Sequence, residues 1–93
     1  MNELEVTDIK VYPFDTTSAG GKIKAYAEVT FNSSLMIRGV KVVQGPGGGL
    51  FVAFPTQRDK EGHFHELVVP LDNATREMIR KKVLAEYKKF ELL

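Results

Sequence analysis

The segment Lys22–Phe31, with the sequence KIKAYAEVTF, decides the fold because apolar and polar side chains alternate along its whole length. Its apolar side is made by Ile23, Ala25, Ala27, Val29 and Phe31. Successive side chains of a strand point to opposite faces, so a period of two indicates a strand with one buried face. We therefore predict a β-strand over Lys22–Phe31 that packs these apolar side chains into a core.

The neighbouring segments extend this strand into a sheet. Glu5–Phe14 has β-rich, roughly alternating character, and Pro13 is typical of a sheet edge or a strand end. The turn-forming residues 15–21 join it to the alternating strand, which predicts a hairpin. Leu35–Gln44 is a further strand, and its apolar phase reverses at Gly39, which predicts a β-bulge at that glycine.

The middle of the chain contains a glycine-rich turn and two more predicted strands. The turn is Gly45–Gly49, and the dense apolar run Leu50–Pro55 predicts a central strand buried on both faces. Thr56–Gly62 is a charged loop by composition, and His63–Val69 predicts a short fifth strand. With a helix after it, the expected fold class is α+β, a mainly antiparallel five-stranded sheet with a C-terminal helix.

The C-terminal helix is predicted over Thr75–Glu91. Asp72 or Asn73 can cap it by accepting a hydrogen bond from a free backbone N–H group. A narrow apolar stripe at helical spacing is made by Ile79, Val83, Tyr87 and Phe90. Basic side chains fall on the opposite side, namely Lys81, Lys82, Lys88 and Lys89.

Composition bounds the class of protein. The chain has 93 residues, 43% hydrophobic and 27% charged, which predicts one small globular domain over residues 1–93. It has no cysteine, so disulfides and thiolate metal sites are excluded. The acidic start MNELE does not resemble a signal peptide, and no apolar run approaches the ~20 residues that span a bilayer. We expect a cytoplasmic protein with no membrane partner.

Charge is distributed unevenly along the chain. Residues 1–72 carry 7 Lys or Arg and 9 Asp or Glu, whereas residues 73–93 carry 6 Lys or Arg and 3 Glu. A slightly acidic body with a basic C-terminal segment points to an anionic partner. The alternative is a helix face that is merely solvated, and charge alone does not separate the two interpretations.

No motif for catalysis, phosphate binding or metal binding stands out. Gly45–Gly49 lacks the Gly-Lys-Ser/Thr that opens a helix in a phosphate-binding loop, and apolar strand residues follow it instead. Glu61, His63 and His65 alternate and could share one face, but a closed zinc site needs four ligands, so surface polar residues are the better interpretation. We therefore expect no enzyme activity, no cofactor and no small-molecule substrate.

Nearly the whole chain resembles the stage V sporulation protein G (SpoVG) family. The resemblance rests on the run Gly39–Tyr87, on the opening VTDIKVYPF and on the strand KIKAYAEVTF. Its most specific part is GLFVAFP at Gly49–Pro55, then a charged loop, Gly-x-Phe at Gly62–Phe64, and a helix start after a proline. The resemblance implies a small dimeric regulator, partly paired through strands, that binds DNA or RNA site-specifically and affects septation, sporulation or virulence genes.

The resemblance also implies contacts from the helix start and from the loop after Phe-Pro. On this chain those positions are Arg58, Asn73, Ala74, Thr75, Arg76, Glu77 and Met78. The helix start combines a dipole with Asn73, Thr75 and Arg76, which can meet a phosphate or a base edge, so Arg76 is the candidate for base reading, with Arg80 one turn further along. Arg58, Lys81 and Lys82 are expected to contact phosphates.

We thus expect a homodimer that binds DNA, RNA or both through Arg58, Asn73, Thr75, Arg76, Arg80, Lys81 and Lys82. A short chain with a sheet edge gains from pairing with a second copy, which favours the dimer. The competing hypothesis is a protein-interaction module of the cell-division machinery, in which the basic helix binds an acidic protein and not nucleic acid.

Overall fold

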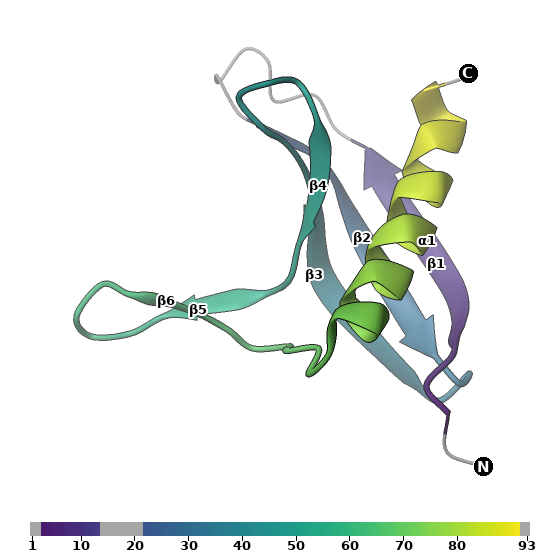
Figure 1. Cartoon of the computed structure of the whole chain (residues 1–93), viewed down its shortest axis with the longest axis horizontal. Coiled ribbons are helices and arrows are strands. Elements are labelled where there is room, and N and C mark those ends of the chain that lie inside the picture. The colour runs from purple at the N-terminus through teal and green to yellow at the C-terminus, as the bar shows by residue number, and fades with distance from the viewer. Residues whose placement is uncertain (1–2, 14–21, 92–93) are drawn as a thin grey trace.

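The computed structural model describes residues 3–13 and 22–91 and shows an antiparallel sheet with a helix across it (Figure 1). The sheet contains β1 (Val6–Pro13), β2 (Ile23–Phe31), β3 (Leu35–Gln44) and β4 (Leu50–Ala53), in the order β1-β2-β3-β4. The α+β class with a mainly antiparallel sheet and a C-terminal helix is confirmed. The predicted turn at 15–21 lies outside the described residues.

The register of β2 explains why its alternation is so regular. Antiparallel neighbours flank β2 on both sides, and its buried face, which includes Ala25, Ala27 and Val29, is almost completely shielded from solvent. The predicted bulge in β3 is confirmed, because the pairing with β2 shifts next to Gly39, whose φ is 86°. An L side chain rarely adopts that backbone angle, so glycine permits the bulge that reverses the phase of β3.

β4 is an edge strand, and the prediction that Leu50–Pro55 is a central strand buried on both faces was wrong. Among the described strands it pairs only with β3. Leu50 and Val52 are half-buried against the core, whereas Phe51 points to the other face and is exposed. The run is apolar because one face joins the core, and the strand stops at Ala53 as the chain leaves the sheet.

The fifth strand does not join this sheet. Thr56–Arg58, expected within a loop, forms β5 and pairs with β6 (Phe64–Glu66) in a separate two-stranded hairpin. The hairpin projects to one side of the sheet, away from the helix (Figure 1). The strands are therefore divided four and two, because Pro55 cannot donate a backbone hydrogen bond to continue the ladder of β4.

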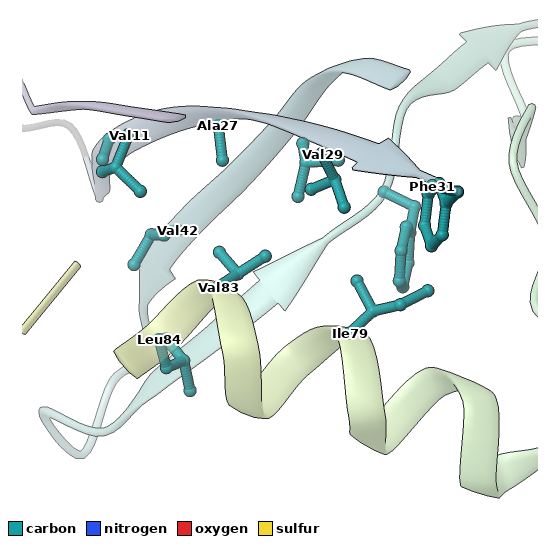
Figure 2. Packing of buried hydrophobic residues seen from close by; sticks show 11 residues of the cluster. Val11, Ala27, Val29, Phe31, Val42, Ile79, Val83 and Leu84 are labelled. Carbon is teal, nitrogen blue, oxygen red and sulfur yellow. The ribbon is translucent and has the colours of Figure 1, made fainter. Parts of the chain in front are cut away.

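The helix α1 (Asn73–Glu91) covers one face of the sheet and closes the core (Figure 1). Figure 2 shows Ile79 and Val83 directed from α1 toward the strands, and Leu84 belongs to the same buried cluster. Leu84 widens the predicted apolar stripe, while Phe90 at its far end is exposed. Burial of a side chain such as Val83 contributes about 1.5–3 kcal/mol, which holds α1 on the sheet.

Within residues 3–13 and 22–91, no helix is long and apolar enough to cross a membrane.

Candidate nucleic-acid interface

The start of α1 is capped by Asp72. Its carboxylate accepts a hydrogen bond from the backbone N–H of Thr75 at 2.7 Å, so Asp72 and not Asn73 is the capping residue. This bond, together with one from the Thr75 hydroxyl, lowers the pKa of Asp72. Asn73 is left exposed at the helix start. A phosphate arriving there would meet the Asp72 carboxylate beside the positive end of the helix dipole, which weakens the attraction.

Arg76 lies one turn further along and is already engaged. Its two terminal nitrogens donate to the Glu66 carboxylate at 3.0 and 3.3 Å, and its guanidinium carbon lies 5.2 Å from the centroid of the Phe54 ring. The hydrogen bond to Glu66 raises the pKa of Arg76. The pair joins the helix start to the end of β6, so Arg76 must leave Glu66 before it can form two bonds to a base.

The remaining basic side chains of α1 differ in how available they are. Arg80 donates to Glu77 at 3.2 Å within the helix. Lys81 and Lys82 are exposed, and neither forms an ion pair with a described residue. Lys82 also lines a shallow pocket of about 300 Å³ between α1 and the start of β1. Among the basic residues of α1 in the predicted site, these two lysines are the ones open to a phosphate.

Arg58 belongs to a strand and not to a loop. It pairs with Phe64 across the hairpin, and its guanidinium carbon lies 5.7 Å from the centroid of the Phe64 ring. Gly62, with φ of 90°, completes the turn; a side chain there would come within 3.4 Å of Arg58. Arg58 is therefore presented by an ordered ribbon that stands apart from α1 (Figure 1).

Asp59 organises the turn of this hairpin. Its carboxylate accepts the backbone N–H groups of Glu61 and His63, both at 2.9 Å, and its second oxygen lies 2.7 Å from Nε2 of His65. The hydrogen bond with His65, followed by that from the His63 backbone, lowers the pKa of Asp59. In the described part of the chain no three side chains of the metal-binding types are arranged to hold an ion.

The predicted site residues thus fall into two groups. Asn73, Thr75, Arg76, Arg80, Lys81 and Lys82 share α1, whereas Arg58 sits on the projecting hairpin. The bond between Arg76 and Glu66 links α1 to the base of that hairpin. Sequence reasoning missed the roles of Glu66 and Phe54 as partners of Arg76, because only the fold brings them together.

Comparison with known proteins places this arrangement in a family. The family model SpoVG matches residues 4–89, which include the whole sheet, the hairpin and nearly all of the helix. The chain belongs to the SpoVG family. The resemblance inferred from GLFVAFP and the strands around it is therefore confirmed.

Several members of the SpoVG family are similar to this chain over most of their length. A septation protein SpoVG of Clostridium perfringens is 37% identical over 90 residues, which cover 97% of this chain and 96% of that protein. Another, from Clostridium kluyveri, is 36% identical over 86 residues, covering 92% and 85% of the two chains. A third, from Anaeromyxobacter dehalogenans, is 38% identical over 84 residues, covering 90% and 78%.

Proposed function

We propose that this chain is a cytoplasmic, non-enzymatic regulator of septation or sporulation that acts as a homodimer by binding DNA or RNA site-specifically. Membership of the SpoVG family, whose members here are named as septation proteins, supports the biological role. The observation that carries the binding role is the exposed basic face of α1, where Lys81 and Lys82 have no acidic partner within the described residues. Such lysines attract phosphates regardless of sequence.

The projecting hairpin supports the homodimer. Apart from the ion pair between Glu66 of β6 and Arg76 of α1, no other described element packs against β5 or β6, and the ring of Phe64 is largely exposed. The segment that follows carries more exposed apolar side chains, including Leu67, Val69 and Leu71, the last 94% exposed. A second copy would cover such side chains and remove the cost of their contact with water. Pairing between strands of the two copies would involve the edges β1 or β4, because β2 and β3 lie inside the sheet.

The same apolar segment also favours the second candidate, a protein-interaction module of the division machinery. In that case a different protein would cover Leu67, Val69 and Leu71. Sedimentation at micromolar concentration separates the two, since a homodimer gives twice the monomer mass without any added protein. A monomer mass under those conditions would reject the homodimer.

Salt dependence of binding tests the role of α1. We expect the double variant Lys81→Ala, Lys82→Ala to bind a labelled DNA duplex more weakly, with the slope of log affinity against log salt reduced by about 2, one unit per phosphate contact. The matched control is the double variant Lys22→Ala, Lys24→Ala, which removes the same charge from Lys24 in β2 and from Lys22 directly before β2. Equal losses in both variants would show that only net charge matters and would reject the assignment to α1.

The target itself is found by sequencing nucleic acid that co-purifies with the protein from its own cells. Binding of the recovered DNA or RNA should be displaced by the same unlabelled nucleic acid and not by an unrelated acidic protein. Displacement by the acidic protein would favour the interaction module instead.

A further inference from the structure

The sheet has a second face, which points away from α1. The helix is the only described element that packs on the sheet, and the core lies beneath it. On the opposite face the register places Tyr12 of β1 across from Tyr26 of β2, and Tyr26 across from Lys41 of β3. Directly opposed residues of antiparallel strands have Cβ atoms about 4.5–5.5 Å apart. Two aromatic rings and an ammonium group therefore stand in one row.

Both rings are accessible, and a hydrogen bond holds Tyr12 in place. The exposed fractions are 50% for Tyr12 and 40% for Tyr26. The hydroxyl of Tyr12 donates to one oxygen of Glu28 at 3.0 Å, and Nε of Arg38 lies 3.1 Å from the other oxygen. The hydrogen bond to Glu28 raises the pKa of Tyr12. This network orients the Tyr12 ring and pairs the charge of Glu28.

The charge that remains on this face is positive. Lys10 lies across from Glu28 in the register, but no ion pair among the described residues involves Lys10 or Lys41. The other carboxylate on this face, Asp8, lies beyond Lys10 toward the start of β1. The two tyrosines are thus flanked by lysines on both sides, on β1 and on β3.

We propose that this tyrosine face, formed by Lys10, Tyr12, Tyr26 and Lys41, binds single-stranded nucleic acid. Bases stack on exposed aromatic rings whatever their sequence, and neighbouring lysines contact the phosphates. A base paired inside a duplex cannot lie flat on a sheet, so single strands are selected. A second copy of the chain fits this face less well, because it would bring the same positive charges against Lys10 and Lys41.

This inference rests on the proposed function, since it names the kind of nucleic acid and adds a surface distinct from α1. The probes are a fluorescent uridine oligonucleotide of about 12 nucleotides and a DNA duplex of similar length. About 12 nucleotides lies within the usual site size of protein surfaces that stack the bases of a single strand. We expect Tyr12→Leu and Tyr26→Leu each to weaken single-strand binding about tenfold and to leave duplex binding unchanged. Tyr12→Phe keeps the ring and should bind nearly as the wild type.

Two further variants provide a control and an independent check. Phe90→Leu removes an equally exposed ring from α1, 40% exposed like Tyr26, and should change neither affinity. Lys10→Glu with Lys41→Glu reverses the charge of the exposed Lys10 and the half-buried Lys41 and keeps both rings, so it tests the face even where a tyrosine variant fails to fold. Neutralising two phosphate contacts reduces the salt slope for a single strand by about 1.4, and the charge reversal should reduce it by at least that much.

The outcomes separate this inference from the proposed function. Suppose that the tyrosine variants and the Lys10→Glu, Lys41→Glu variant fold and bind the single strand with wild-type affinity, while Lys81→Ala, Lys82→Ala loses binding. That result overturns the tyrosine face and leaves the role of α1 intact. A change of dimer mass in Tyr12→Leu or Tyr26→Leu would assign the face to contact between copies and overturn it as well. If the wild type bound neither probe and no recovered nucleic acid, the inference and the proposed function would both fail.

Discussion

The pair formed by Arg76 and Glu66 makes a sharp prediction about base reading. In the free protein the two terminal guanidinium nitrogens of Arg76 donate to the Glu66 carboxylate, at 3.0 and 3.3 Å. If Arg76 reads a base, Glu66 competes with that base for the same donors. The substitution Glu66→Gln weakens this competition and removes a negative charge from the interface, so it should increase the affinity for the target site.

The structure limits the size of this gain. The side chains of Arg76 and Glu66 are 37% and 34% exposed, so water and salt screen the pair. Exposed ion pairs change an equilibrium constant by no more than about fivefold. We therefore expect Glu66→Gln to raise the affinity for the target site by about two- to fivefold. Arg76→Ala should lower the affinity for the best site and reduce the ratio between its affinity and that of a scrambled site.

The assay measures the affinity for the best site and for the scrambled site by fluorescence anisotropy at a fixed salt concentration. Glu61→Gln removes the same charge from the tip of the hairpin, where Glu61 has no arginine partner in the described chain, and so corrects for general electrostatics. Circular dichroism establishes that each variant is folded. Unchanged or lower affinity in folded Glu66→Gln, relative to Glu61→Gln, would refute base reading and leave Arg76 as a structural clamp between α1 and β6.

Three further predictions concern stability. Val83→Ala removes two methyl groups from a fully buried site and should lower the free energy of unfolding in urea by about 2–3 kcal/mol, while the exposed Lys81→Ala leaves it nearly unchanged. Gly39→Ala should cost about 1–2 kcal/mol in the same assay, because φ there is 86° although Pro55 leaves room for a Cβ; an unaltered midpoint would mean that the bulge relaxes. Asp72→Ala should lower the melting temperature by several degrees at neutral pH. Because the pKa of Asp72 is lowered in the folded state, its contribution is complete above the ordinary carboxyl pKa and disappears as pH falls through the folded value, so a difference that persists in strong acid would contradict this origin.

The sequence by itself determined the elements whose signal is local. The alternation of Lys22–Phe31 depends only on the period of a strand, and the phase reversal at Gly39 marks the bulge within the same segment. The sequence also predicts that Asp72 or Asn73 caps the helix, because a capping side chain bonds to a backbone N–H only three residues further along. The specific segment GLFVAFP identified the family, which the match over residues 4–89 confirms.

Only the tertiary structure decided where the strands sit and which charges are paired. An apolar run such as Leu50–Ala53 is compatible both with a central strand and with an edge strand that has one face on the core. It is an edge strand here because the chain leaves the sheet at Pro55. Glu66 reaches Arg76 only because the hairpin returns to the helix start, and Tyr12 meets Tyr26 only through the register of β1 and β2. Contacts between elements depend on how the chain folds back on itself, and local residue patterns do not record that path.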